Sequence, residues 1–305
     1  MHIRSFMQSD AWEKFQAAFG MRTERVDGQL MIEHPTVLGR YWYCPRPALL
    51  GTSTLAALKD AAVRNAALFV RIDPDLGYDA RTLTGQSTVR TLPTAPQDSL
   101  LLDVSPSEDA LLESFHTKLR YNIRLAMRRG LTVSHSSNPT GRELMAFLEL
   151  AKGTGGRQQF HYHPVGYYQT MLELLGEVGQ ELTVSCLVVW HEQVPVAALI
   201  LLIDHPAHTA YYLHGASSYP HRAFMGPHLV QWEAIRTAKA AGALQYDFWG
   251  IAPEAAPNDH PWTGITRFKL GFGGVRVRYS DSFDLIVDPV RSRLYRLARS
   301  IRRRL

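Results

Sequence analysis

Two cationic side chains, separated by a single residue, lie in a glycine-rich segment near the end of the chain. In Thr263–Gly274, with the sequence Thr-Gly-Ile-Thr-Arg-Phe-Lys-Leu-Gly-Phe-Gly-Gly, Arg267 and Lys269 flank Phe268. The glycines that follow allow backbone conformations and close approaches that a Cβ would block. We expect a loop that leads into a strand over Val275–Tyr279, where the two cations could hold an anionic group or an oxyanion. The alternative is the entry of a bulged strand whose two charges are solvated.

A second set of cations follows helical spacing. Ser105–Glu108 has the pattern of a capping box with proline at the first helical position, and Gly130 is a stop signal. The apolar face of this predicted helix consists of Leu111, Phe115, Leu119 and Ile123. Its basic face consists of Lys118, Arg120, Arg124, Arg128 and Arg129. Like charges at this spacing repel one another, so the basic face is either fully solvated or contacts a polyanion such as RNA phosphate.

Aromatic and basic side chains elsewhere are further candidates. In a predicted strand, Tyr212 and His214 share one face because side chains alternate along a strand. Arg157 lies in a polar, glycine-rich segment that we expect to be a loop. Arg222 comes shortly before a predicted helix start at Gly226, where an anion could bind or where a helix simply begins.

The predicted elements alternate between strands and helices, which is typical of an α/β fold. Helices are predicted over 9–19, from a cap at Thr54, over 105–130, from Thr140, around 167–175, from Gly226 and after Asp288. Strands are predicted over 29–33, 40–44, 68–72, 100–104, 182–190, 194–204, 209–215, 244–250 and 283–287. The pair 182–190 and 194–204 has the pattern of a hairpin.

The helix after Asp288 is rich in arginine, and no acidic residue follows Asp288. We expect four apolar residues of this helix to face inward, namely Leu294, Leu297, Ala298 and Ile301. Its basic tail could touch RNA or an anionic membrane surface. The alternative is a docked terminal helix with a frayed basic end.

Composition excludes several classes of protein. With 305 residues, 46% hydrophobic and 20% charged, the chain has an ordinary globular balance and room for two domains. No apolar run approaches the roughly 20 residues that span a bilayer, and residues 1–10 have no apolar signal core, so we expect a cytoplasmic protein. Cys44 and Cys186 lie in apolar contexts and are expected to be buried thiols. We expect neither a metal site nor a cofactor.

Five motifs, in order along the chain, resemble the FemABX-type transferases that form peptidoglycan bridges. They are Lys118-Leu-Arg-Tyr-Asn-Ile-Arg-Leu-Ala, Tyr212-Leu-His-Gly-Ala-Ser-Ser, Gln231-Trp-Glu-Ala-Ile, Tyr246-Asp-Phe-Trp-Gly and Arg267-Phe-Lys-Leu-Gly-Phe-Gly-Gly. The opening segment Met7–Phe15 is similar to the first helix of that family. The resemblance extends over nearly the whole chain.

The resemblance implies an α/β fold of two tandem GNAT-like domains, each a mixed, mostly antiparallel sheet flanked by helices, without a long coiled-coil arm. The first domain would comprise residues 1–98 and 281–305, and the second, which carries the catalytic motif, residues 99–280. The implied reaction moves an amino acid from aminoacyl-tRNA to an amine of a lipid-linked or UDP-linked peptidoglycan precursor. We expect a monomer that contacts the inner membrane face peripherally.

The resemblance also implies roles for individual residues. Lys269 matches the catalytic lysine of the family, and Phe268 matches a neighbour whose backbone contributes to the site. Tyr212 and His214 lie where the family has two aromatic residues that contact substrate, and histidine is a departure from that pattern. The other substrate-binding candidates are Lys14, Asp73, Arg157 and Arg267. The basic face of the helix predicted over 105–130, rather than the resemblance, supplies the tRNA-binding candidates, which are Lys118, Arg120, Arg124 and Arg128.

The expected chemistry needs few protein groups. An aminoacyl ester is already activated, so the enzyme must position two substrates and stabilise the developing oxyanion, which is the role expected of Lys269. No histidine or carboxylate is placed as an obvious base, so we expect substrate groups or the leaving ribose to take the proton. Two other classes stay open: a GNAT-type enzyme that uses acyl-CoA, suggested by Arg222 and Gly226, and a non-catalytic RNA-binding or envelope-assembly module.

Overall fold

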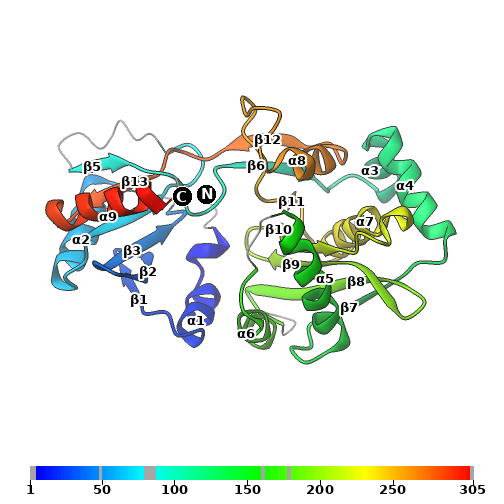
Figure 1. Cartoon of the computed structure of the whole chain (residues 1–305), viewed down its shortest axis with the longest axis horizontal. Coiled ribbons are helices and arrows are strands. Elements are labelled where there is room, and N and C mark those ends of the chain that lie inside the picture. Colours follow the sequence, from blue (N-terminus) through cyan, green and yellow to red (C-terminus); the bar gives the residue numbers. More distant parts are fainter. Residues whose placement is uncertain (1–4, 48–49, 79–86, 159–161, 177–179, 303–305) are drawn as a thin grey trace. The chain divides into compact units, whose positions relative to one another are not determined.

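Contacts along the chain divide the protein into two units, Met1–Gln97 with Arg278–Leu305, and Asp98–Val277. The structure is a computed structural model that describes residues 5–47, 50–78, 87–158, 162–176 and 180–302. Each unit has one mixed sheet with helices beside it (Figure 1). The predicted α/β fold with two mixed, mostly antiparallel sheets is therefore confirmed.

The first unit has a six-stranded sheet in the order β1-β2-β3-β4-β13-β5. Its strands are β1 (Thr23–Val26), β2 (Gln29–Thr36), β3 (Gly39–Pro45), β4 (Phe69–Asp73), β5 (Thr88–Arg90) and β13 (Phe283–Ile286). β3 and β4 are parallel, and the other neighbours are antiparallel. Because β13 lies between β4 and β5, this sheet is complete only when residues Phe283–Ile286 have joined it.

The helical elements of the first unit are the short η1 (Phe6–Gln8), α1 (Asp10–Ala18), α2 (Thr52–Arg64) and α9 (Pro289–Arg302). As predicted, Ser9 caps α1, and its hydroxyl accepts a hydrogen bond from the Trp12 N–H at 3.0 Å. The predicted cap of α2 is wrong. The N-cap is Gly51, and the Thr54 hydroxyl instead donates to the carboxylate of Asp27.

The orientation of α9 also differs from the prediction. Ser292 is fully buried and donates to the main-chain carbonyl that precedes β4 at 2.8 Å, and the Tyr295 ring lies 5.3 Å from that of Phe69. Leu294 and Leu297 are 50% and 58% exposed. A small hydroxyl side chain and a flat ring allow α9 to lie close to β4, and this contact leaves the leucines on the opposite side of the helix.

A buried ion pair joins β4 to β13. Arg71 and Asp284 are partners in the antiparallel register, with Nε to Oδ1 at 2.8 Å and Nη2 to Oδ2 at 3.0 Å. The two side chains are 2% and 0% exposed. Burial raises the pKa of Asp284, while the hydrogen bonds and charge of Arg71 act in the opposite direction. Each charge is therefore tolerated in the interior only while its partner is present.

The second unit has a seven-stranded sheet in the order β12-β6-β11-β10-β9-β8-β7. Its strands are β6 (Asp98–Asp103), β7 (Thr132–Ser136), β8 (Leu182–His191), β9 (Val194–Asp204), β10 (Thr209–Ser217), β11 (Gln245–Asp247) and β12 (Val275–Arg278). β8 and β9 form the predicted hairpin. β10 is antiparallel to β9 and parallel to β11, so the sheet changes direction at this pair.

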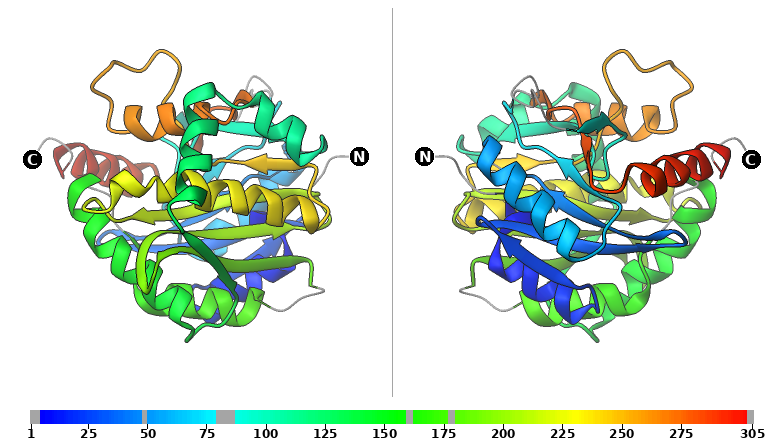
Figure 2. Two further views of the ribbon diagram at one scale, coloured as in Figure 1. Left: turned by 90° about the vertical axis from the view of Figure 1, so that its right-hand side faces the viewer. Right: turned by 90° about the vertical axis from the view of Figure 1, so that its left-hand side faces the viewer.

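Helices cover both faces of the second sheet (Figure 2). α7 (Gly226–Ala240) packs on one face, and α4 (Thr117–Arg128) packs against α7. α5 (Arg142–Gln158) and α6 (Val165–Leu175) pack on the other face. The predicted loop around Arg157 is wrong as far as Gln158, because α5 continues to that residue.

The predicted helix over 105–130 is interrupted. It consists of α3 (Glu108–Ser114), which Ser107 caps, and α4, and Phe115 between them has an extended backbone. The Phe115 ring is buried against Trp232 and Phe272, at centroid distances of 5.6 and 5.2 Å. The next residue, His116, donates its N–H to the carbonyl of Gly271 at 2.9 Å. Tertiary packing of Phe115 therefore overrides a continuous helical pattern.

Three further observations complete the description of the fold. The segment predicted as a loop is a helix, α8 (Thr263–Leu270), whereas the strand predicted from Val275 is present as β12 (Val275–Arg278). Both cysteines are buried free thiols, as predicted. Within the described ranges, no helix has both the length and the apolar character that crossing a bilayer requires.

We predict that Asp284→Asn lowers the free energy of unfolding by about 3–5 kcal/mol, because it leaves the guanidinium of Arg71 buried without its counter-charge. Urea unfolding followed by circular dichroism measures the loss. The control is Arg90→Gln, which removes an ion pair to Asp281 whose side chains are 74% and 41% exposed. That change should cost at most about 1 kcal/mol. Equal losses in the two variants would contradict the structural role of the buried pair.

Candidate active site

Lys269 is buried in the last turn of α8. Its side chain is 5% exposed, and Nζ donates to the carbonyl of Gly250 at 2.7 Å and, more weakly, to that of Trp249 at 3.4 Å. Nζ also lies 5.3 Å from the ring centroid of Tyr212. The ammonium group is thus held by main-chain dipoles and an aromatic face.

The backbone after β11 is shaped to present these carbonyls. Asp247, at the end of β11, accepts hydrogen bonds on Oδ1 from the hydroxyl of Ser99 and, at 2.7 Å, from the N–H of Trp249. Trp249 has a φ of 60°, a left-handed conformation that is uncommon for a bulky residue. The hydroxyl of Thr266 on α8 then accepts from the N–H of Ala252 at 2.8 Å. Side-chain contacts therefore fix the loop on both sides of the carbonyls that face Lys269.

Burial changes the proton affinity of Lys269. Desolvation disfavours the ammonium form and lowers the pKa of Lys269 to about 7, while the negative charge of Asp247 partly opposes this shift. Near neutral pH the side chain therefore exists in both protonation states. Such a shift, at a side chain with specific partners, is typical of a functional group.

The other two residues of the predicted catalytic segment differ in environment from Lys269. Residues that are two positions apart in a helix point in directions about 200° apart. Arg267 therefore lies on the side of α8 opposite Lys269, where it is exposed. The idea of two paired cations at a strand entry is therefore wrong. Phe268 is half-buried, with its ring 5.3 Å from that of His228 and 5.4 Å from that of Phe272.

A bulge in β10 separates Tyr212 from His214. Tyr212 is opposite Leu201 and His214 is opposite Ile200, so Leu213 is the extra residue. Tyr212 consequently packs on the face covered by α7, where Lys269 lies, whereas His214 belongs to the opposite face. The prediction that the two side chains share one face is wrong, because a single inserted residue reverses the alternation.

Gly215 makes room for Tyr212. A Cβ on this glycine would lie 1.8 Å from the Tyr212 hydroxyl oxygen, so any other residue would displace the ring. The carbonyl of Gly215 accepts a hydrogen bond from the hydroxyl of Tyr162 at 2.7 Å. Sequence reasoning missed the structural roles of Gly215, Trp249 and Gly250, although all three lie inside quoted motifs.

His214 lies in an aromatic cluster on the other face. Its ring centroid is 5.2 Å from that of Tyr168 on α6 and 5.6 Å from that of His163. Burial lowers the pKa of His214 to about 3, and the nearby charge of His163 adds to this effect. Within the described part of the chain, its buried Nδ1 has no hydrogen-bond partner. His214 is therefore a neutral imidazole at physiological pH.

Two predicted substrate residues belong to the first unit. Asp73 is fully buried, and its Oδ2 accepts hydrogen bonds from the Tyr43 hydroxyl at 2.9 Å and from the N–H groups of Thr94 and Ala95 at 2.8 Å each. Through these contacts Asp73 has a structural role, because it fixes the backbone of the segment before β6. Its assignment to substrate binding stays a prediction.

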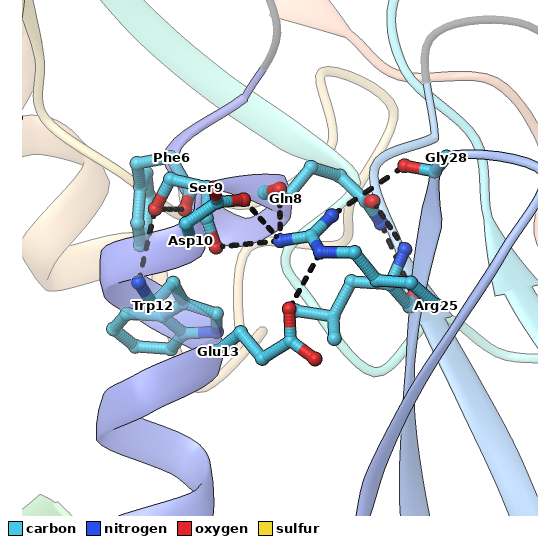
Figure 3. Close-up of polar contacts among 9 residues, drawn as sticks. Phe6, Gln8, Ser9, Asp10, Trp12, Glu13, Arg25 and Gly28 are labelled. Carbon is cyan, nitrogen blue, oxygen red and sulfur yellow. Dashed lines mark hydrogen bonds and ion pairs between the residues drawn. The ribbon is translucent and has the colours of Figure 1, made fainter.

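Lys14 is exposed on α1, whose position is fixed by Arg25 of β1. The Arg25 guanidinium donates to the carbonyls of Gln8 and Ser9 at 3.1 Å each and pairs with Glu13 (Figure 3). These bonds join β1 to the start of α1 and leave Lys14 in solvent. Arg157 lies on α5, and its side chain is outside the described part of the structure.

The predicted tRNA-binding cations lie on α4. Lys118, Arg124 and Arg128 are exposed, and no carboxylate of the described residues pairs with them. Arg120 is half-buried and donates to the hydroxyl of Thr117 at 3.3 Å. Tyr121, on the same helix, is 55% exposed. The result is a basic surface with an aromatic side chain in it.

Comparison with known proteins assigns the family. The model of the FemAB family matches residues 88–190 and 188–300, so the chain belongs to the FemAB family. This confirms the resemblance and the expected class of enzyme, an aminoacyltransferase. The lipid II:glycine glycyltransferase of Staphylococcus aureus is 24% identical over 326 residues, a match that covers 82% of this chain and 76% of that protein.

Solved structures show the same fold. The crystal structure of FemX has a TM-score of 0.75 at 21% identity and covers 96% of this chain and 94% of that one. A tandem GNAT protein from the clavulanic acid biosynthesis pathway has a TM-score of 0.55 at 10% identity, with 87% and 82% covered. At these identities the likeness supports the fold alone.

We predict that Lys269 makes stability depend on pH. The pKa of Lys269 is about 7 in the folded protein and about 10.4 in an unfolded chain. Between these values only the unfolded state binds the proton, so the free energy of unfolding rises with pH. The free energy of unfolding of the wild type, minus that of Lys269→Met, should rise by up to about 1.4 kcal/mol per pH unit. Urea unfolding at pH 7.5 and 9 measures this difference. Lys152→Met, at an exposed lysine, is the control, and its difference from the wild type should not change with pH. If the difference between the wild type and Lys269→Met were also independent of pH, the lowered pKa of Lys269 would be contradicted.

Proposed function

We propose that this protein transfers an amino acid from aminoacyl-tRNA to an amine of a peptidoglycan precursor, and that Lys269 stabilises the oxyanion of this reaction. The observation that carries the proposal is a buried lysine, held by two carbonyls, in a chain of the FemAB family. The name of the staphylococcal relative, lipid II:glycine glycyltransferase, supports a lipid-linked acceptor over a UDP-linked one.

The reaction forms one bond and breaks another. The precursor amine attacks the ester carbonyl, a C–N bond forms, and the C–O bond to the tRNA ribose breaks. The proton leaves the amine and passes to the ribose oxygen, so no covalent enzyme intermediate is needed. The Lys269 ammonium has three donors; the carbonyls of Gly250 and Trp249 occupy two, and the third faces the developing oxyanion. Phe268, the neighbour of Lys269 in α8, contributes its backbone to the site in this proposal.

The donor is bound, in this proposal, by the basic surface of α4. Lys118, Arg124 and Arg128 are exposed, and the Arg128 guanidinium lies 6.0 Å from the ring centroid of Tyr121. Phosphate contacts would relieve the repulsion among these cations, and an exposed ring offers a stacking surface for a base. The remaining substrate-binding assignments, to Lys14, Asp73, Arg157, Tyr212, His214 and Arg267, stay predictions. We place the protein in the cytoplasm, as a monomer at the inner membrane face.

Lys269→Met should reduce kcat for aminoacyl transfer by about 100- to 1000-fold, because it removes one oxyanion donor. The measurement uses radiolabelled aminoacyl-tRNA with a lipid-linked precursor in detergent and, separately, with a UDP-linked precursor, and identifies products by mass. Lys152→Met is the matched control and should retain full activity. Near-normal transfer by Lys269→Met would exclude the assignment.

The pH profile separates two roles of the same lysine. If protonated Lys269 donates to the oxyanion, the ratio of wild-type to Lys269→Met activity falls as the pH rises through about 7, the pKa of Lys269. A ratio that rises over this range would instead make Lys269 a general base. Taking the ratio removes the contribution of the acceptor amine, which titrates in both enzymes.

Arg124→Glu/Arg128→Glu should weaken tRNA binding at least tenfold. A plot of log affinity against log salt concentration has a negative slope, and the variant should reduce the magnitude of this slope by about 2, because each arginine neutralises one phosphate. Filter binding at several salt concentrations measures both quantities. Arg64→Glu/Lys152→Glu changes the net charge equally at exposed positions outside α4 and should have little effect. The same loss in both variants would mean a general charge effect.

An acyl-CoA donor is the alternative reaction. Before α7, Gly226 packs against Val196, and the exposed Arg222 has its guanidinium 4.3 Å from the ring centroid of Tyr219. Offering acetyl-CoA in place of aminoacyl-tRNA in the same assay decides between the two donors.

A further inference from the structure

The apolar stripe of α9 faces solvent. Val290, Leu294 and Leu297 recur at helical spacing and are 70%, 50% and 58% exposed. The side of α9 that packs on the first sheet carries instead the buried Ser292 and the ring of Tyr295. An exposed stripe of this kind is uncommon on a helix that is docked to a sheet, because docking normally buries the apolar side.

The charges around this stripe are of one sign. α9 contains five arginines, at positions 291, 293, 296, 299 and 302, and no acidic residue. Arg293 is exposed and lies about one helical turn from Val290 and Leu297. Arg291 is half-buried and pairs with Asp288, the last acidic residue of the chain. On α9 the apolar stripe is therefore flanked by Arg291 and Arg293, and the helix itself carries no acidic residue.

The size and chemistry of this surface favour a lipid bilayer. A stable protein–protein interface takes roughly 20–30 residues on each side, whereas this stripe has three exposed apolar residues. An amphipathic helix needs only such a stripe to lie in the headgroup region of a membrane, with arginines on its polar edges. Each arginine near an anionic membrane surface contributes about 1 kcal/mol. RNA would match the arginines but would leave the leucines without a partner.

We propose that α9 binds the surface of anionic bilayers, with Leu294 and Leu297 inserted among the lipid chains and Arg293 at the headgroups. This surface is built from the first unit alone and needs no catalysis, so it goes beyond the proposed reaction. A lipid-linked acceptor would then be met by an enzyme already concentrated at the membrane.

The test is co-sedimentation of the full-length protein with vesicles of phosphatidylcholine, alone or with 30 mol% phosphatidylglycerol (about one anionic lipid in three, typical of the regime in which basic helices bind). The wild type should bind the anionic vesicles and bind the neutral ones weakly. Leu294→Gln/Leu297→Gln should reduce binding to anionic vesicles at least tenfold. Val63→Gln/Leu244→Gln, at positions that are 56% and 53% exposed elsewhere in the protein, is the matched control and should bind as the wild type does.

Three outcomes would overturn the proposal. The first is no binding of the wild type to anionic vesicles. The second is full binding by Leu294→Gln/Leu297→Gln, which would mean adsorption by charge alone. The third is a dimer, seen by analytical ultracentrifugation, that the same variant dissociates, because the stripe would then be a contact between two copies. Transfer to a soluble UDP-linked precursor by Leu294→Gln/Leu297→Gln should equal that of the wild type, so a failure of the proposed reaction would be seen separately.

Discussion

The site in the second unit depends on one interaction, the contact of the Lys269 ammonium with the carbonyls of residues 249 and 250. An unpaired ammonium would be too costly to bury, and two carbonyl dipoles make its burial possible without a carboxylate in direct contact. Desolvation lowers the pKa of the lysine, and the negative charge of Asp247 opposes this shift only in part. The left-handed backbone of Trp249 and the hydrogen bond from its N–H to Asp247 hold these carbonyls in place.

The same sheet separates two environments. The extra residue in β10 places Tyr212 beside Lys269 and puts His214 among tyrosines on the other face. One side of the sheet therefore holds a cation that can change its protonation near neutral pH. The other side holds an imidazole that stays neutral. A histidine that cannot take a proton at this pH agrees with a reaction in which the substrates themselves carry the proton away.

Much of the fold could be predicted from the sequence, because capping residues and apolar periodicity are local. Ser9, the hairpin of β8 and β9, and the class of fold follow from such signals. The errors have non-local causes. The break at Phe115 needs the rings of Trp232 and Phe272, and the outward leucines of α9 follow from the fit of Tyr295 against β4. Lys269 was identifiable by its motif, but its carbonyl partners and its separation from Arg267 depend on α8 being a helix.

The Arg71–Asp284 pair links residues that are far apart in sequence, and it has a consequence for biosynthesis. During translation the first unit emerges early but lacks β13, so β4 has an open edge and an arginine without its counter-charge. The whole second unit, Asp98–Val277, is synthesised between β4 and β13 and can fold as a domain of its own. The N-terminal sheet can therefore be completed only after the second unit has been synthesised, so the part of the protein that is made first cannot be the first to reach its native state.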